Sequence, residues 1–248
     1  MLQNLRHEKI LRHLEINRAV KVTELAKELK ISESTIRRDI AELDREGRLK
    51  KVFGGAVPVA PGRISASTYV AERSQINPEG KERIARFAAT LIDDDDFVYI
   101  DAGTTTRRMV DYIENSNASY VTNGIVHAGI LIQKGFDVYM IGGDLRPMTE
   151  AAVGASAIEA LGKFNFTKCF MGTNGIDIRG GFSTPDIGEA AMKTTAIQKS
   201  GTSFILADST KFGLISSVTF AKLDSAYIIT DRMEDPLYLK AARIKKIV

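Results

Sequence analysis

The chain has 248 residues, 44% hydrophobic and 26% charged, and this composition excludes a disordered or fibrous protein and allows two domains. No early apolar run resembles a signal peptide, and no segment approaches the roughly 20 apolar residues of a membrane span, so we expect a cytoplasmic protein. A single cysteine, Cys169, excludes an internal disulfide. The histidines at 7, 13 and 127 lack the spacing of a zinc site, so we expect no metal and no cofactor.

The positive charge is concentrated at the start of the chain. Residues 1–56 carry 13 Lys/Arg and 9 Asp/Glu residues, whereas the rest of the chain carries 21 and 22. This distribution is compatible with a nucleic-acid-binding head on a neutral body, although so small an excess is also common on ordinary protein surfaces. Charge by itself therefore leaves both interpretations open.

Apolar residues at helical spacing predict three short amphipathic helices before residue 47. The apolar residues are Ile10, Leu11 and Leu14 in the first helix; Val22, Leu25, Ala26 and Leu29 in the second; and Ile36, Ile40 and Leu43 in the third. Ser32 is the expected N-cap of the third helix, and Gly47 is expected to end it. Because the isoleucines face inward, the polar residues Glu33, Ser34, Thr35, Arg37 and Arg38 fall on or beside the solvent face. Such side chains suit a DNA groove, so we predict the recognition helix of a helix-turn-helix.

A hairpin is predicted next, over GRLKKVFGGAV at residues 47–57, because short β-prone runs flank a double glycine. A hairpin after three helices indicates a winged helix, whose wing lies over the DNA backbone and brings Lys50 and Lys51 close to phosphates. The alternative is that both lysines are merely solvated on a three-helix domain.

The middle of the chain indicates a linker and then an α/β domain. Three of the six prolines fall within residues 58–78, which we interpret as the linker, and a helix is expected from Glu79 to Leu91. Apolar strand-like runs then alternate with helical patterns: FVYIDAG, SYVTNG, DVYMIGG, KCFMGTNG, SFILADS and AYIITD. This alternation predicts parallel strands buried on both faces, with a ligand at their carboxyl ends.

The clearest strand end is DAGTTTRRMVDYI, residues 101–113. Gly103 permits a tight turn, and Thr104, Thr105 and Thr106 offer N–H groups and hydroxyls at the start of the next helix, where a phosphate fits. Threonines also cap helices for purely structural reasons, and that alternative stays open. The stretch contains neither a Walker loop nor a GxGxxG fingerprint, so nucleotide binding is unsupported.

Other strand ends offer partners for a small phosphorylated polyol. These are Thr122 and Asn123 for hydroxyls, Gly142 and Gly143 for close backbone approach, and Asp208 with Lys211 as an acceptor and a cation. Glu189 and Lys193 lie four residues apart, which fits either an exposed ion pair on a helix or a role in the ligand site.

Both halves of the chain resemble DeoR-type bacterial transcriptional repressors. The resemblance rests on Thr35, Arg37, Arg38, Asp39 and Gly54-Gly55-Ala56, and on DAGTTT, VTNG, IGGDLR, GTNGI, GGFSTPD, EAAMK, LADSTKFG and IITD. It implies a winged helix-turn-helix domain over 1–57 and, after the 58–78 linker, an α/β effector domain over 79–248 that resembles ribose-5-phosphate isomerase. The chain departs from the family at Phe53, where many members carry histidine.

The resemblance also implies a function: a repressor that binds operator DNA as a homo-oligomer and responds to a phosphorylated sugar. Within the family the chain looks most like fructose-operon repressors, which implies fructose 1-phosphate, and next like lactose-operon repressors, which sense tagatose 6-phosphate. The expected DNA-binding residues are Ser34, Thr35, Arg37, Arg38, Lys50, Lys51, Gly54 and Gly55. The expected effector-binding residues are Lys81, Asp101, Gly103, Thr104, Thr105, Thr106, Thr122, Asn123, Gly142, Gly143, Asn174, Glu189, Lys193, Asp208 and Lys211.

Two other classes of function are weighed against this one. A sugar-phosphate isomerase needs a carboxylate base, for which Asp177 or Glu189 with Lys193 is available, but the spacing in GIDIRGGFSTPDIGEAAMK lacks the second acid and the adjacent Glu-Lys of those enzymes. An RNA-binding regulator is disfavoured because the head has no Trp or Tyr and only Phe53 as a stacking surface. We therefore predict a binding protein and not an enzyme.

Overall fold

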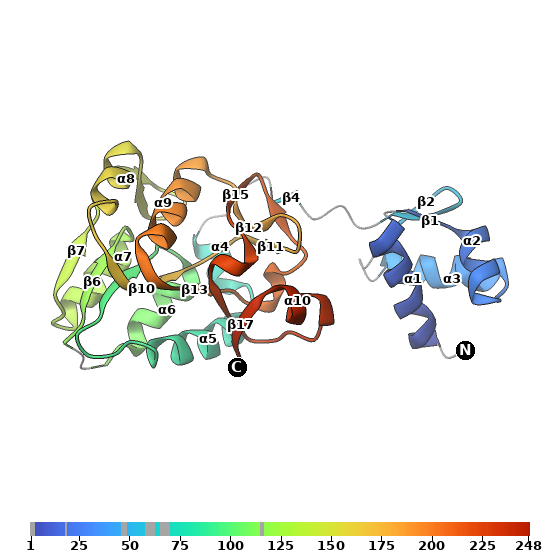
Figure 1. The fold of residues 1–248 in the computed structure, drawn as a ribbon, viewed down its shortest axis with the longest axis horizontal. Coiled ribbons are helices and arrows are strands. Elements are labelled where there is room, and N and C mark those ends of the chain that lie inside the picture. The colour runs from blue at the N-terminus through green and yellow to red at the C-terminus, as the bar shows by residue number, and fades with distance from the viewer. Residues whose placement is uncertain (1–2, 18, 46–48, 58–62, 65–69, 115–116) are drawn as a thin grey trace. The chain divides into compact units, whose positions relative to one another are not determined.

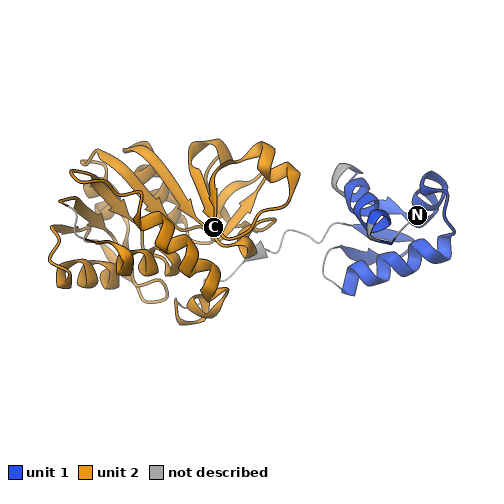
Figure 2. Ribbon diagram, turned by 90° about the horizontal axis from the view of Figure 1, so that it is seen from below, with its two compact units in different colours: residues 1–62 blue, residues 63–248 orange. Residues whose placement is uncertain are grey.

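The structure is a computed structural model that describes residues 3–17, 19–45, 49–57, 63–64, 70–114 and 117–248. It divides into two compact units, Met1–Gly62 and Arg63–Val248 (Figure 2). Within the described ranges, no helix has the length and apolar character needed to cross a membrane. Each unit has its own hydrophobic core.

Unit 1 contains the three predicted helices and a small sheet (Figure 1). Its elements are α1 (Gln3–Asn17), β1 (Val20–Lys21), α2 (Val22–Leu29), α3 (Glu33–Arg45), β2 (Lys50–Val52) and β3 (Gly55–Val57). Ile10, Leu25, Ile36 and Leu43 are buried together, as the helical spacing predicts. The expected end of the third helix at Gly47 lies outside the described residues.

The wing forms because its glycines satisfy two different demands. Val52 pairs with Gly55, so Phe53 and Gly54 make a two-residue turn, and Gly54 has a φ of 79° in the left-handed region that favours glycine. Gly55 is buried between β1 and β2 in the sheet order β1-β3-β2, and a Cβ there would collide with the carbonyl of Val20.

Unit 2 is built around a seven-stranded parallel sheet in the order β17-β16-β13-β10-β5-β6-β7. Its strands are β5 (Phe97–Ile100), β6 (Ser119–Thr122), β7 (Val138–Met140), β10 (Phe166–Met171), β13 (Ser200–Leu206), β16 (Tyr227–Thr230) and β17 (Arg243–Ile247). The first six are the strands that the apolar runs predict. β17 was not predicted, because it is a basic edge strand with little apolar character.

Helices cover both faces of this sheet, so alternate strand residues enter two different cores. Val98 and Ile100 pack with α5 (Pro78–Ala89), α6 (Thr104–Tyr112) and α7 (Ile125–Gln133), whereas Tyr99 and Cys169 pack with α8 (Ala155–Leu161), α9 (Ile187–Gln198) and α10 (Pro236–Ala241). Figure 1 shows α5 and α6 on one side of the sheet and α8 and α9 on the other. The predicted burial on both faces is confirmed for central strands such as β5 and β10, but not for edge strand β7, where Tyr139 and Met140 are exposed.

Shorter elements surround the sheet. They are β4 (Arg63–Ile64), α4 (Val70–Gln75), β8 (Asp144–Arg146), β9 (Ala151–Val153), β11 (Gly175–Asp177), β12 (Gly181–Thr184), η1 (Ser209–Lys211), β14 (Ile215–Ser216), β15 (Val218–Ala221) and η2 (Leu223–Ser225). Two of them, β4 and α4, fall in the segment 58–78 that was predicted as a linker. β4 pairs with β14, so the chain from Arg63 onward belongs to unit 2. Residues 58–62 and 65–69 of that segment lie outside the described residues.

The strand order reverses direction between β5 and β10. From β5 the chain proceeds outward through β6 and β7, and it then returns to the other side of β5 with β10, β13, β16 and β17. In an open parallel sheet, the connections leave such a reversal point on opposite faces, and a crevice opens at the carboxyl ends of the two strands. The topology therefore directs attention to the loops after Ile100 and Met171.

Candidate functional site

A pocket lies at that reversal point and holds about 470 Å³ of space, counting its open mouth. The loop after β5 contributes Ala102 and Gly103, the start of α6 contributes Thr104 and Thr105, and the loop after β10 contributes Gly172 to Asn174. The remaining lining residues come from four helical segments and one strand end: Arg73 from α4, Lys81 from α5, Glu189 and Lys193 from α9, Lys211 from η1, and Leu206 at the end of β13. The pocket is thus small, polar and rich in cations.

The start of α6 supplies backbone donors to this pocket. Gly103, the N-cap, has an extended conformation and provides no capping side chain. Because the first N–H groups of a helix have no partner within the helix, those at Thr104 and Thr105 are available to an anion. The start of the helix carries the positive end of its dipole, which favours the same charge.

Arg73 brings a cation without a partner. Among the described residues, its Nε and Nη2 atoms are inaccessible to solvent and have no hydrogen-bond acceptor. Burial lowers the pKa of Arg73, opposed by the attraction of Glu189 and Asp101. Two buried guanidinium nitrogens without a bonded acceptor are unfavourable, and an anionic ligand in the pocket would relieve this cost.

The Lys81 side chain contacts groups of the protein itself, and two of them lie at the end of α4. Its ammonium donates a 2.7 Å hydrogen bond to the carbonyl of Arg73 and another to the carbonyl of Ile76, and it lies 3.6 Å from Asp208. A cation at these carbonyls stabilises the carboxyl end of α4. Lys81 therefore fixes the helix that carries Arg73.

Lys193 and Asp101 form a buried ion pair at the pocket wall. The Lys193 ammonium donates to Asp101 and to the carbonyl of Gly172, the latter at 3.0 Å. Burial raises the pKa of Asp101, and the neighbouring Lys193 opposes that shift. Glu189, one turn earlier on α9, lies 3.0 Å from the Thr184 hydroxyl. Lys193 is thus paired before any ligand arrives.

Lys211 completes the cationic lining. Burial lowers its pKa, and Asp208 opposes that effect by attraction, while Arg73 adds to it by repulsion. Burial likewise lowers the pKa of Lys81 against the attraction of Asp208. Desolvation thus outweighs the attraction of the local acids in setting the pKa of Arg73, Lys81 and Lys211. Among the described residues, the pocket region brings four cations, Arg73, Lys81, Lys193 and Lys211, together with three acids, Asp101, Glu189 and Asp208.

The structure brings most of the expected effector residues together. Eight of them line the pocket: Lys81, Gly103, Thr104, Thr105, Asn174, Glu189, Lys193 and Lys211. Asp101 and Asp208 do not line it but pair with Lys193 and Lys81. Arg73 was missed, because it lies in a helix of only six residues within the predicted linker, where no local pattern indicates a ligand.

The other expected effector residues do not line the pocket. The Thr106 hydroxyl donates to the carbonyl of Asp101, the Thr122 hydroxyl accepts from the N–H of Gly124, and the Asn123 amide binds the backbone of Ala102 and Ala152. Gly142 and Gly143 lie just before β8, after an outer strand of the sheet. The loops after β6 and β7 are one and two strands away from the reversal point, which is why they fall outside the pocket.

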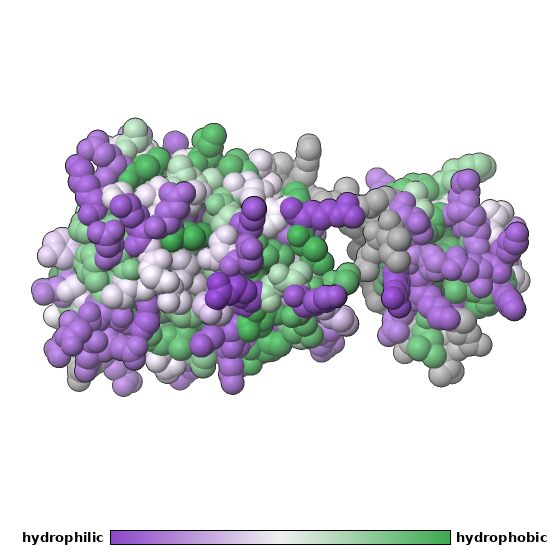
Figure 3. All heavy atoms as spheres, viewed as in Figure 1, coloured by the Kyte–Doolittle hydropathy of each residue, from purple (hydrophilic) through white to green (hydrophobic). Residues whose placement is uncertain are grey.

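The expected DNA-binding face of α3 is largely accessible. Ser34, Arg37 and Arg38 are exposed and Thr35 is half-buried, opposite the buried Ile36 and Ile40. Arg37 forms a 2.9 Å ion pair with Glu33, whereas Arg38 has no bonded partner in the part of the chain that the structure describes. Hydrophilic residues dominate the face of unit 1 seen in Figure 3.

The wing residues divide into exposed and buried positions. Lys50, Lys51 and Gly54 are exposed, but Gly55 is buried in the sheet, so its expected contact with DNA is replaced by packing against Val20. The backbone N–H of Lys51 donates to Asp44 on α3 at 2.8 Å. This bond ties the wing to the helix it accompanies.

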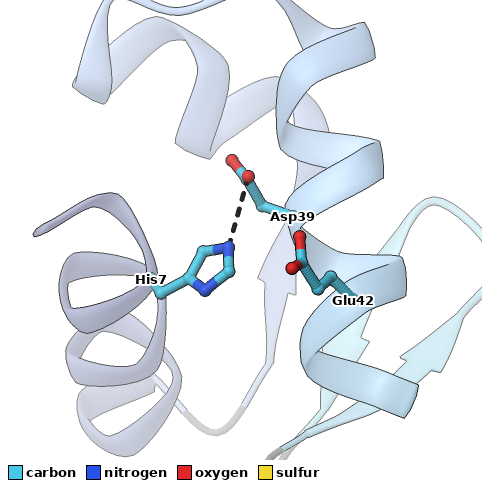
Figure 4. A group of neighbouring side chains, drawn as sticks. All are labelled: His7, Asp39 and Glu42. Atoms are coloured by element: carbon cyan, nitrogen blue, oxygen red, sulfur yellow. Dashed lines mark hydrogen bonds and ion pairs between the residues drawn. The ribbon is translucent and has the colours of Figure 1, made fainter. Parts of the chain in front are cut away.

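A group of possible metal ligands in unit 1, His7, Asp39 and Glu42, has another explanation (Figure 4). Arg6 donates to both carboxylate oxygens of Asp39, at 2.5 and 2.6 Å, and His7 lies 3.3 Å from one of them. Both oxygens of Asp39 are therefore engaged by side chains of α1. The cluster serves to join α1 to α3.

Comparison with known proteins gives the family. The DeoR C terminal sensor domain matches residues 76–232, and the DeoR-like helix-turn-helix domain matches residues 6–61. The chain belongs to the DeoR family. As a DeoR-family member, it is a transcriptional regulator with a helix-turn-helix domain and a sensor domain.

Two relatives match this chain over most of its length. It is 39% identical over 236 residues to a protein of Bacillus subtilis described as an uncharacterized HTH-type transcriptional regulator, FruR, spanning 95% of this chain and 93% of that one. It is 32% identical over 208 residues to a lactose phosphotransferase system repressor of Staphylococcus epidermidis, spanning 83% and 82%. Among solved structures, a ribose 5-phosphate isomerase from Methanocaldococcus jannaschii is similar with a TM-score of 0.42 and 12% identity over 55% of each chain, a likeness of fold alone.

Proposed function

We propose that the chain is the repressor of a sugar-utilisation operon and that its pocket binds a phosphorylated sugar. The observation that supports this most directly is the guanidinium of Arg73, whose Nε and Nη2 atoms are buried without a bonded acceptor in the same pocket as the N-terminus of α6. A phosphate between them would receive charge-assisted bonds from Arg73 and backbone bonds from Thr104 and Thr105. Lys211 supplies a further cation on the same pocket.

Two polar residues of the same pocket suit the sugar. Asn174 and Glu189 both lie close to the Thr184 hydroxyl, at 3.1 and 3.0 Å, and can bind ligand hydroxyls. The resemblance to fructose-operon repressors makes fructose 1-phosphate the first candidate, and the resemblance to lactose-operon repressors makes tagatose 6-phosphate the alternative. The ligand would shift the protein between states of different DNA affinity, which requires that it bind these states unequally.

Calorimetry with fructose 1-phosphate, tagatose 6-phosphate and unphosphorylated fructose tests this proposal. We expect one phosphorylated sugar to bind and fructose not to bind. Lys211→Ala should abolish the binding, whereas Lys163→Ala, a lysine exposed on the surface near α8, should leave it unchanged. If neither sugar phosphate binds, the proposed effector is wrong, and the family membership is unaffected.

We propose no enzymatic activity for this pocket. Asp177, one of the two carboxylates available to an isomerase, accepts hydrogen bonds from the backbone of Arg179 and Gly180 and does not line the pocket. Lys193 is already paired with Asp101 and is therefore not free to assist Glu189 as a base. Conversion of either sugar phosphate, followed by NMR, would contradict this view.

For DNA, we propose that α3 enters the major groove and that the wing follows the backbone. Arg38 is the best candidate for a base contact, because it is exposed and has no competing partner among the described residues. Arg38→Ala should weaken operator binding by about 1–3 kcal/mol at fixed salt, as measured by anisotropy of labelled DNA. Lys9→Ala on α1 is the matched control, and an unchanged affinity for Arg38→Ala would remove that residue from the DNA-reading set.

We also propose a homo-oligomer formed through α7 and the neighbouring sheet edge. Of the fifteen exposed large apolar residues among the described positions, six lie between 125 and 145: Ile125, Val126, Ile132, Tyr139, Met140 and Leu145. Such a concentration is typical of a protein interface. α7 contains no charged residue, so a second copy related by a two-fold axis would bring no like charges together.

Sedimentation of the full chain tests this interface. Ile132→Glu should reduce the molecular mass to that of a smaller species, because the new carboxylate would be buried in the interface. Leu237→Glu, at an exposed apolar position on α10, should leave the mass unchanged. Equal behaviour of the two variants would show that copies associate elsewhere or not at all.

A further inference from the structure

The tip of the wing carries a phenyl ring that the protein leaves in water. Phe53 has a relative exposure of 108%, compared with 50% for Leu5 and 39% for Val52, the other exposed large apolar residues among the described positions of unit 1. The ring takes no part in the core, although Leu49 and Ala56, a few residues away on the same hairpin, are fully buried. The exposed ring adds nothing to the core, and its apolar area is available to a surface that covers it.

The hairpin presents this ring at an unobstructed point. Phe53 lies in the two-residue turn between paired Val52 and Gly55, and a Cβ at Gly54 would meet no atom within 4 Å. Gly54 therefore adds no bulk beside the ring. The backbone bond from Lys51 to Asp44 fixes the base of the hairpin against α3. The hairpin therefore presents a narrow apolar tip and is itself fixed against α3.

The charges beside the tip indicate what covers it. Lys50 and Lys51 precede Phe53 and are exposed, and residues 50–57 include no acidic residue. An apolar tip that follows two exposed lysines on its own strand matches a polyanion better than an ordinary protein surface. Proteins that contact the minor groove often insert an apolar side chain between base pairs, and phenylalanine is one of the residues used in this way.

We propose that Phe53 is a wedge that enters the minor groove of the operator and unstacks one base step, while Lys50 and Lys51 bind the flanking phosphates. This rests on the proposed DNA-binding face of unit 1. Because pyrimidine–purine steps unstack most easily, Phe53 would favour TA or CA/TG at its position without any hydrogen bond to a base. The residue thereby contributes to specificity through deformability, in addition to direct reading by α3.

The test uses the full chain and a duplex selected from a random-sequence library by the wild-type protein. Three variants are compared: Phe53→Ala removes the wedge, Phe53→Leu keeps an apolar one, and Leu5→Ala is the control for loss of an exposed apolar side chain elsewhere in unit 1. Affinity is measured by anisotropy at fixed salt. Base unstacking is measured by the fluorescence of 2-aminopurine placed at successive positions of the duplex.

We expect Phe53→Ala to weaken binding roughly tenfold or more and to abolish the rise in 2-aminopurine fluorescence, since the unstacked step is lost. Phe53→Leu should retain both, and Leu5→Ala should match the wild type. Wild-type affinity in Phe53→Ala, or no fluorescence rise with the wild type, would overturn the wedge while leaving DNA binding intact. Failure of the wild type to select any duplex would overturn the DNA-binding proposal itself.

Discussion

The Lys81 ammonium donates a 2.7 Å hydrogen bond to the carbonyl of Arg73, so a lysine on α5 holds the end of the helix that places a guanidinium in the pocket. Lys81 is only 1% exposed and also faces Asp208. In the proposed ligand site, we therefore expect Lys81 to position Arg73. This arrangement links the pocket to α4, one of the first elements of unit 2 after the chain leaves unit 1.

Arg73 should limit stability in the absence of ligand. We expect Arg73→Met to weaken sugar-phosphate binding by roughly 10- to 100-fold, because a charge-assisted bond is lost. The same substitution should leave the melting temperature of the ligand-free protein unchanged or raise it, since a cation with two buried, unbonded nitrogens is removed. Calorimetry and thermal unfolding measure the two effects. A large drop in ligand-free stability would indicate a structural role instead.

The Lys193–Asp101 pair should behave as a unit. Asp101→Asn leaves the 4% exposed Lys193 without its counter-charge, so we expect it to lower the free energy of unfolding by about 3 kcal/mol. Asp101→Leu combined with Lys193→Met should lower the free energy of unfolding by much less than the sum of the losses caused by the two single substitutions. Chemical denaturation of the four proteins checks this. Additive effects would show that the two side chains are not energetically coupled.

His127 should make unit 2 sensitive to acid. It is 5% exposed, its Nε2 lies 3.1 Å from the Thr106 hydroxyl, and burial lowers its pKa to about 4 from 6.5. The unfolded chain therefore takes up a proton at higher pH than the folded one. The contribution is fully present above pH 6.5 and is lost as the pH falls towards 4, by at most about 3 kcal/mol.

This pH dependence can be isolated by substitution. The fall in melting temperature between pH 7 and pH 4.5 should be smaller in His127→Gln than in the wild type, because glutamine does not titrate. The carboxylates of the chain titrate in both proteins alike. The contribution of His127 is therefore the difference between the two falls in melting temperature. Identical pH profiles would show that His127 does not control the acid response.

The Arg6–Asp39 contact should stabilise unit 1 without reading DNA. Asp39 is 1% exposed and receives both hydrogen bonds from Arg6, so Asp39→Ala should lower the melting temperature of unit 1 by several degrees. Arg38→Ala, at the neighbouring exposed position, should weaken DNA binding with no such loss. Parallel thermal and anisotropy measurements separate the two roles. An unchanged melting temperature of the Asp39→Ala protein would show that apolar packing, and not this contact, holds α1 against α3.

The sequence by itself determined the local elements and the family. Helical spacing of Ile36, Ile40 and Leu43 predicts α3, and continuous apolar runs predict six of the seven strands, because burial of one stripe or of both faces leaves a repeating pattern along the chain. Edge strand β17 escaped prediction because exposure and positive charge remove that pattern. Motifs such as DAGTTT and LADSTKFG carried the family resemblance.

Only the tertiary structure decided which polar residues share a pocket. Asn123 follows a strand in the same way as Asp101 does, yet its amide binds the backbone of Ala102 while the loop after β5 faces the ligand space. Arg73 enters that space from a short helix that no pattern marks. Strand order depends on contacts between residues far apart in the chain, and it is this order that brings the ends of β5 and β10 together with α4, α5 and α9.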